Sequence, residues 1–301
     1  MDVDQIRMAL GGNRRSLART LTNIENGTVT IQQIRSLLGD NDSTVKSKAW
    51  GSLAITGAPG VGKSCLIDKL LKIWALQGNK IALLAIDPSS PRTGGALLGD
   101  RVRITAIDNE AIKNQIYIRS IATRKSSGSV PLIVADMIDF LHMAKWDKVV
   151  IETVGSGQSE VRCAAIADRI VVVEGPARGD GVQAEKAGLL ELADAVVVNK
   201  SDLPGASKHA EELLESFELG LGDVPPVMLT SALNEIGVDE AAKVLIQLVD
   251  SGRSVRARWR ERLLAHNERK ILESPKLEEI LASLAVGSTS IDEAVRTLSG
   301  E

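Results

Sequence analysis

Aromatic residues are scarce in this chain: Phe, Trp and Tyr together make up 2% of its 301 residues. Proteins that hold single-stranded nucleic acids stack the bases on aromatic rings. The formal net charge of −3 also gives no attraction to nucleic acids or to anionic membrane surfaces. We therefore expect neither a nucleic acid nor a membrane as a partner.

Long hydrophobic runs and cysteine motifs are missing as well. No run of about 18 apolar residues occurs, so no membrane-spanning helix is expected. The first residues lack the apolar core of a signal peptide. Cys65 and Cys163 form no CxxC pair, and His142, His209 and His266 are scattered. We expect reduced thiols in a cytoplasmic protein, without a disulfide framework or a Cys/His metal cluster.

Hydrophobic periodicity divides the chain into three regions. Residues 1–45 carry apolar residues at helical spacing, interrupted at Gly11-Gly12 and closed by Gly39, and are predicted to be a helical extension. Residues 46–250 alternate short apolar runs with longer helical stretches. Residues 251–301 begin with a very basic helix, whose arginines we expect to form a solvated face around an apolar seam. Two further helices are expected, one near Ser274-Pro275 with the proline in its first turn and one after Ser290.

The apolar runs of the central region read as β-strands. They are Ser52–Thr56, Lys80–Ile86, Gln115–Arg119, Lys148–Thr153, Arg169–Val173, Asp194–Val198 and Val227–Thr230. Most show no alternation of polar and apolar residues, which is typical of strands covered by helices on both faces. Strands that alternate with helices predict an α/β fold with a mainly parallel sheet and right-handed crossovers.

A phosphate-binding loop is the strongest motif. GAPGVGKS, Gly57 to Ser64, matches GxxxxGK[ST] between an apolar strand and an amphipathic helix. Glycines let backbone N–H groups point at phosphate, and the helix N-terminus favours anions. Lys63 is expected to reach the β- and γ-phosphates, and the Ser64 hydroxyl to bind Mg²⁺. The residues expected to contact the nucleotide phosphates are Gly57, Pro59, Gly60, Val61, Gly62, Lys63, Ser64 and Cys65.

A second motif predicts that the base is guanine. Asn199-Lys200-Ser201-Asp202 ends an apolar strand in the NKxD arrangement of GTPases. The Asp202 carboxylate can accept hydrogen bonds from guanine N1–H and the 2-amino group, both of which adenine lacks. Ser231 and Ala232 follow the next strand, where backbone N–H groups can contact guanine O6. The combination with the phosphate loop predicts a GTP site.

Carboxylates at strand ends are candidates for Mg²⁺ binding and hydrolysis. Glu152 ends the strand KVVIE, and Asp87 ends IALLAI. Both positions favour metal binding or the orientation of water, although an Asp-Pro pair is also common in turns. The Gly155 N–H can contact the γ-phosphate. Gln158 is the candidate for positioning the attacking water, and Lys63 for stabilising the transferred charge.

Four segments together resemble one family. GAPGVGKS, DPSSPRTGGALLGDR, ETVGSGQSE and NKSD, in that order, are similar to the MeaB/ArgK family of SIMIBI-class P-loop GTPases. The resemblance implies a GTPase that gates delivery of adenosylcobalamin to an acyl-CoA mutase and helps to eject damaged cofactor. The mutase would act on methylmalonyl-CoA or on isobutyryl- or hydroxyisobutyryl-CoA.

The resemblance also implies assembly and site features. It implies a homodimer built partly through the C-terminal helices, and it allows an adenosyltransferase as a further partner. Its Mg²⁺ environment would consist of Ser64, Asp87, Asp100 and Glu152. A third switch would run from Gly175 to Lys186.

The third switch departs from the family pattern. Ala177 and Arg178 replace the usual residues, whereas Asp180, Gln183 and Lys186 are kept. This change bears on partner choice and GTPase activation. Arg178 reads as a solvated surface charge, or alternatively as a group that stabilises the transition state.

Two other functions fit part of the sequence. A nickel-delivery GTPase of the same class would be expected to carry His-rich tracts or Cys/His clusters, and neither occurs. An ArgK-like kinase would need a base for an acceptor hydroxyl, and no catalytic-loop motif such as HRD occurs.

Overall fold

The structure is a computed structural model. It describes residues 2–39, 50–87, 104–122, 133–153, 162–176, 184–219, 223–249, 255–272 and 274–299. None of the helices in these ranges is long and apolar enough to cross a bilayer.

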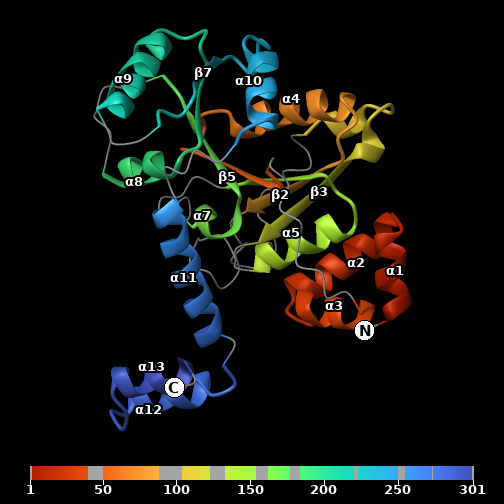
Figure 1. The fold of residues 1–301 in the computed structure, drawn as a ribbon, viewed down its shortest axis with the longest axis vertical. Helices are drawn as coiled ribbons and strands as arrows, with labels where there is room; N and C mark the ends of the chain where they lie inside the picture. Colours follow the sequence, from red (N-terminus) through yellow and green to blue (C-terminus); the bar gives the residue numbers. More distant parts are fainter. Residues whose placement is uncertain are drawn as a thin grey trace.

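A parallel sheet of seven strands forms the centre of the described structure (Figure 1). The strand order is β3-β2-β4-β1-β5-β6-β7, and every neighbouring pair is parallel. The strands are β1 (Ser52–Thr56), β2 (Ile81–Asp87), β3 (Ile116–Ala122), β4 (Lys148–Glu152), β5 (Arg169–Glu174), β6 (Ala195–Asn199) and β7 (Val227–Thr230). The predicted α/β fold is confirmed, with strand ends within a few residues of those expected.

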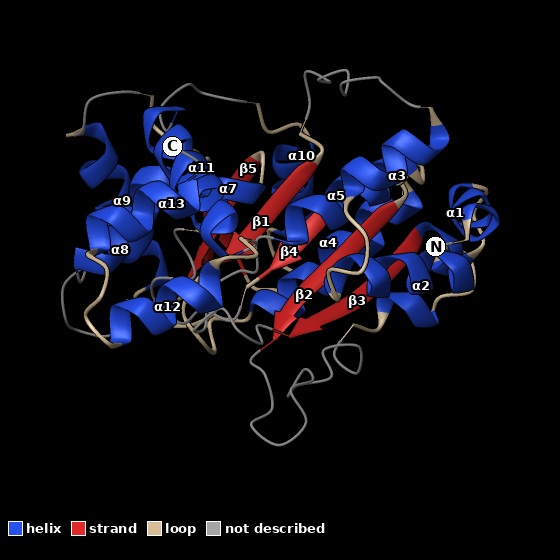
Figure 2. Ribbon diagram, turned by 90° about the horizontal axis from the view of Figure 1, so that it is seen from below, coloured by secondary structure: helices blue, strands red, loops and turns tan. Residues whose placement is uncertain are grey.

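Helices cover both faces of the sheet, which explains the absence of alternation in the strands (Figure 2). Every residue of β1, β5 and β6 is buried. Leu53 and Ile55 of β1 pack in one apolar cluster and Ala54 in the other. One face is covered by α4 (Lys63–Leu76), α10 (Val238–Ile246) and the short helix η2 (Ala106–Asp108), which η3 (Lys113–Gln115) follows along the chain. The other is covered by α5 (Ile133–Met143), α7 (Cys163–Ile166), α8 (Ala184–Leu192) and α9 (Ala206–Glu218).

The predicted N-terminal helices form and pack into this same core. They are α1 (Val3–Leu10), α2 (Arg14–Glu25) and α3 (Ile31–Leu38). Gly39 ends α3 in the left-handed region at φ 67°, a conformation that glycine adopts without strain. Arg119 of β3 donates to Glu25 at 2.5 Å, and Arg14 donates to the Ile116 carbonyl at 2.8 Å. These contacts attach α2 to the β3 edge of the sheet. The domain boundary predicted at residue 45 lies outside the described residues.

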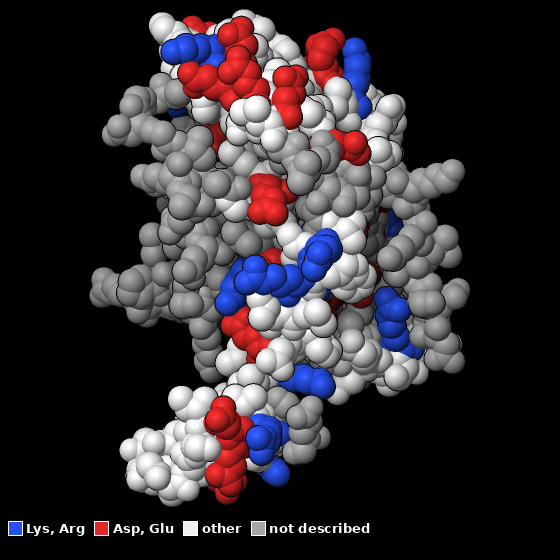
Figure 3. Space-filling model, turned by 60° about the vertical axis from the view of Figure 1, so that its left-hand side comes forward, with Lys and Arg blue, Asp and Glu red and all other residues white. Residues whose placement is uncertain are grey.

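The C-terminal helices extend away from the sheet. They are α11 (Val255–Leu272), α12 (Leu277–Ala285) and α13 (Ile291–Ser299), and the last two form a projecting lobe (Figures 1 and 3). The Ser290 hydroxyl caps α13 by accepting from the Glu293 N–H at 3.2 Å, and the helix begins after Ser290 as predicted. The expected start of α12 was two residues early. Pro275 lies in a turn closed by Leu277 N–H and the Ser274 carbonyl, because its fixed φ fits a turn as well as a helix start.

The prediction that the α11 arginines form a solvated face is wrong for two of them. Arg258 is only 5% exposed and donates to the Asp194 carboxylate and the Asp168 carbonyl. Arg269 holds both carboxylate oxygens of Asp136 in α5, at 3.0 and 2.8 Å. Charge periodicity cannot show these contacts, because carbonyl groups and carboxylates of the sheet layer and of α5 decide which arginines become buried.

The pair of Arg258 and Asp194 therefore attaches α11 to the sheet. Asp194 also accepts from the Ile170 N–H at 2.7 Å. Burial raises the pKa of Asp194, whereas the neighbouring guanidinium of Arg258 favours its charged form. The carboxylate depends on this counter-charge, because an isolated buried charge is costly.

We predict that Arg258→Ala lowers the free energy of unfolding by about 3–5 kcal/mol, because it leaves a carboxylate buried without its counter-charge. Arg262→Ala on the same helix is the control. Its guanidinium lies 5.3 Å from the Trp259 ring, a contact worth about 1 kcal/mol at an exposed site. Urea unfolding measures both. Equal losses in the two variants would show that Arg258 does not anchor the helix.

Candidate nucleotide-binding site

The predicted nucleotide-binding residues meet at the carboxyl edge of the sheet. The phosphate loop follows β1, Glu152 ends β4, and Asn199 ends β6. Ser231 comes directly after β7. Ligands of open parallel sheets bind outside the carboxyl ends of the strands, where connections diverge to the two faces. The central position of β1 places the phosphate loop in this crevice.

Two glycines of the phosphate loop are required by close approaches. Gly57 has φ 141°, and a Cβ atom there would lie 2.0 Å from the Val173 carbonyl oxygen. Gly62 has φ 96°, and its Cβ would lie 2.4 Å from Asn199 Nδ2. Any larger residue would push the loop away from β5 or from the NKSD loop. The structure thus explains why the turn needs glycine at both places.

Lys63 lies inside the phosphate loop. It begins α4 and is 7% exposed. Its ammonium group donates to the carbonyls of Gly57 at 2.6 Å and Ala58 at 3.1 Å. The cation is therefore held at the centre of the loop. Cys65 lies in the same first turn of α4, and burial raises the pKa of its thiol.

Ser64 and Glu152 meet beside the loop. The Ser64 hydroxyl donates to Glu152 Oε1 at 2.6 Å, and Glu152 is buried. A hydroxyl and a carboxylate are hard oxygen donors of the kind that Mg²⁺ prefers, so this pair fits the ion. Asp87 ends the neighbouring strand, two residues after Ala85, which is in register with Glu152. The Asp87 side chain lies outside the description, so its metal role stays a prediction.

Asn199 connects the phosphate loop to the base-recognition loops. Its side chain is 2% exposed. The amide Nδ2 donates to the Val61 carbonyl at 2.9 Å. Oδ1 accepts from the Thr230 hydroxyl at 3.1 Å and from the Ala232 N–H at 3.0 Å. Three hydrogen bonds of the Asn199 side chain thus join the phosphate loop, the end of β7 and the loop that follows β7.

Lys200 and Asp202 each contact one of the loops that Asn199 joins. Lys200 adopts φ 62°, and its ammonium group donates to the Gly60 carbonyl at 2.7 Å. Asp202 is exposed, and its Oδ1 accepts from the Ser231 hydroxyl at 2.5 Å. The structure therefore brings the NKSD residues together with Ser231 and Ala232, the arrangement predicted for a guanine site.

The loop after β7 is fastened to the phosphate-loop helix. Glu235 follows Ser231 and Ala232 and accepts from Lys69 of α4 at 2.5 Å. This hydrogen bond raises the pKa of Lys69 and lowers that of Glu235. Nothing in the sequence indicated the pair, since 166 residues separate its members.

Other supporting contacts also escaped the sequence. The hydroxyl of Thr153 donates to that of Thr56 at 2.8 Å, joining the ends of β4 and β1. Asp68 of α4 accepts from Thr105 and from the Ala106 N–H. Local patterns place such residues on a strand or a helix, but the partner is set by the packing of distant segments.

Several predicted site residues lie outside the described residues. They are Asp100, Gly155, Gln158, Arg178, Asp180 and Gln183. Lys186 belongs to α8, but its side chain is not described. Their roles stay predictions. Within the described ranges, no group of three or more His, Cys, Asp or Glu side chains could hold a metal ion.

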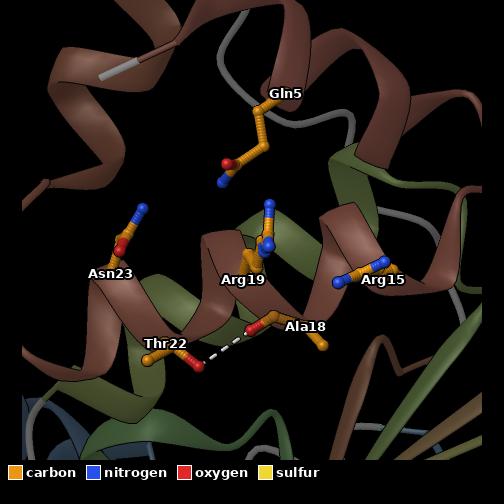
Figure 4. Close-up of a pocket in the computed structure, with 6 residues that line it drawn as sticks. All are labelled: Gln5, Arg15, Ala18, Arg19, Thr22 and Asn23. Atoms are coloured by element: carbon orange, nitrogen blue, oxygen red, sulfur yellow. Dashed lines mark hydrogen bonds between the residues drawn. The ribbon is translucent and has the colours of Figure 1, made fainter.

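A separate hollow of about 470 Å³ lies on the N-terminal helices (Figure 4). It is lined by Gln5, Arg15, Ala18, Arg19, Thr22 and Asn23. These residues belong to α1 and α2, so the hollow is no part of the crevice at the strand ends.

Comparison with known proteins agrees with this geometry. The family model for methylmalonyl-CoA mutase-associated GTPase MeaB matches residues 17–280, most of the chain. The chain belongs to the MeaB family. Membership makes it a GTPase that binds guanine nucleotides and hydrolyses GTP, as the NKSD and phosphate loops predicted.

Relatives and a solved structure extend the comparison. A protein of Pyrococcus horikoshii named as a GTPase is 39% identical over 239 residues, covering 76% of this chain and 72% of that protein. A fused isobutyryl-CoA mutase of Cupriavidus metallidurans is 36% identical over 215 residues, covering 68% of this chain and 19% of that protein. The crystal structure of a LAO/AO transport system kinase superposes with a TM-score of 0.63 at 23% identity. It covers 99% of this chain and 96% of its own, and supports the fold.

We predict that Gly62→Ala disrupts the MeaB-type phosphate loop more than Gly60→Ala. Both glycines have positive φ, so each substitution carries a backbone cost of about 1–2 kcal/mol. Only the Gly62 variant also collides with Asn199, because no atom lies within 4 Å of a Cβ at Gly60. Thermal unfolding should show the larger loss for Gly62→Ala. Indistinguishable melting temperatures would contradict the close approach to Asn199.

Proposed function

We propose that this MeaB-family GTPase couples GTP binding and hydrolysis to the loading, protection and reactivation of an adenosylcobalamin-dependent acyl-CoA mutase. The observation that carries the proposal is the joined phosphate and NKSD site on a chain of this family. The fused isobutyryl-CoA mutase supports the mutase partner, since a segment similar to this chain occurs within it.

In the proposed site, the base and the phosphates are held by different loops. Asp202 accepts from guanine N1–H and the 2-amino group, and O6 faces the loop after β7, in which the Ala232 N–H expected to contact O6 donates to Asn199 Oδ1 instead. The N–H groups of Gly60, Val61 and Gly62 contact the phosphates. Asn199 sets the distance between the two ends because it bonds to Val61 and Ala232 at once. A nucleotide of the right length therefore meets a preorganised site.

Hydrolysis follows from the positions of Lys63, Ser64 and Glu152. The Lys63 ammonium exchanges the carbonyls of Gly57 and Ala58 for β- and γ-phosphate oxygens, where it stabilises charge as the γ-phosphoryl group leaves. Ser64 and Glu152, with Asp87 and Asp100, would hold Mg²⁺, which neutralises charge on the phosphate oxygens when bound. Gln158 is proposed to orient the attacking water.

The C-terminal helices are proposed to form a homodimer contact. Trp259 and Leu263 of α11 are 55% and 68% exposed. Leu281 of α12 and Ile291 and Val295 of α13 are exposed as well. Several large exposed apolar side chains on projecting helices are typical of surfaces that pack against another chain. Arg258 and Arg269 hold α11 to the GTPase core, so a dimer contact there would be linked to that core.

We predict a slow GTPase that is stimulated at least about tenfold by one purified acyl-CoA mutase, because binding of the partner would place Gln158 and the third switch against the phosphates. The measurement is phosphate release with each candidate mutase for methylmalonyl-, isobutyryl- and hydroxyisobutyryl-CoA. Release without a phosphorylated acceptor also separates hydrolysis from kinase activity.

Lys63→Ala is the matched control. It should reduce stimulated hydrolysis by about 100-fold or more, because it removes a donor to the transferred charge. Fast turnover by the isolated chain, or no stimulation by any of these mutases, would contradict the proposed coupling.

A further inference from the structure

Asn234 contacts Ser231, one of the predicted base-recognition residues, but belongs to none of the predicted nucleotide-binding motifs. We propose that Asn234 is a positioning residue that orients the Ser231 hydroxyl and, through it, the Asp202 carboxylate that reads guanine. The inference rests on the proposed guanine site and concerns its specificity.

Two hydrogen bonds in series connect these side chains. Asn234 Nδ2 donates to Ser231 Oγ at 3.0 Å, and Ser231 Oγ donates to Asp202 Oδ1 at 2.5 Å. A serine hydroxyl has one hydrogen to donate. Because the Asn234 amide approaches Oγ as a donor, the serine hydrogen is directed to Asp202. A group that accepted from Oγ at this position would compete with Asp202 for that hydrogen.

The loop that carries Asn234 is held in place from several sides. Ser231 and Ile236 exchange backbone hydrogen bonds of 2.9 and 3.1 Å. Glu235 is fastened to Lys69 of α4. Gly237 has φ 69°, and a Cβ there would lie 2.3 Å from the Leu229 carbonyl oxygen. Asn234 is exposed, but its backbone lies between these fixed points, so its amide stays near Ser231.

Orientation matters because Asp202 itself is exposed. A carboxylate that reads N1–H and the 2-amino group must present both oxygens in the plane of the base. The Ser231 hydroxyl holds one of these oxygens, while Ser231 is 1% exposed and hence fixed. Losing the direction of this hydroxyl should weaken GTP binding more than the binding of a nucleotide without the 2-amino group, because such a nucleotide needs only the N1–H contact. Inosine triphosphate, which lacks that group, is the probe for this effect.

The test compares Asn234→Asp with wild type by titration with GTP and with inosine triphosphate. Aspartate has nearly the same shape but accepts where asparagine donates. GTP affinity should fall about three- to tenfold, the order of one weakened charge-assisted hydrogen bond. The ratio of GTP to inosine triphosphate affinity should fall by a similar factor. Asn234→Ala should give a smaller loss in the same direction, because Ser231 keeps its hydrogen but loses its orientation.

Asn114→Asp is the control for charge, since it makes the same change in the exposed part of η3. It should leave both affinities unchanged. Wild-type behaviour of Asn234→Asp, or an equal loss of affinity for both nucleotides, would overturn the positioning role.

Asp202→Asn separates this failure from failure of the guanine site. An amide there complements xanthine, whose C2 carbonyl replaces the 2-amino group, so preference should move from GTP to xanthosine triphosphate. If the preference does not move, Asp202 does not read the base, and the role of Asn234 is refuted together with the site.

Discussion

The Asn199 side chain is the contact on which the nucleotide site depends. Its amide Nδ2 donates to the phosphate loop, and its Oδ1 accepts from β7 and from the loop that follows β7. The same amide nitrogen would collide with any Cβ at position 62. One buried side chain therefore fixes both the shape of the phosphate loop and its distance from the base-recognition residues. In a low-dielectric interior such a network is strong when every member is satisfied.

The sheet provides the frame for this contact. Parallel strands bring the ends of β1, β4 and β6 to one edge, so residues far apart in the sequence meet there. Lys69 and Glu235 add a second connection between the phosphate-loop helix and the base loop. Since Lys200 also bonds to Gly60, the phosphate and base halves of the site are joined at three places. A displacement of the phosphate loop is therefore expected to displace the base-recognition loops as well.

Much of this arrangement could be predicted from sequence because the determining signals are local. Uninterrupted apolar runs such as AVVV predicted strands buried on both faces, and the glycine spacing of GAPGVGKS predicted a phosphate turn. What escaped depends on distant partners. The burial of Arg258 is decided by Asp194 and by carbonyls of the sheet layer, and Asn234 gains its role only from Ser231 and Asp202. Pro275 shows a different limit, because its fixed φ suits a turn and a helix start equally.

The account requires that guanine rather than adenine fits the connected loops. Calorimetric titration of the nucleotide-stripped chain with GTP and with ATP, in the presence of Mg²⁺, tests this most directly. We predict that GTP binds at least about 100-fold more tightly, because adenine would leave the Asp202 carboxylate without its two donors. Equal affinity for the two nucleotides would contradict the central claim.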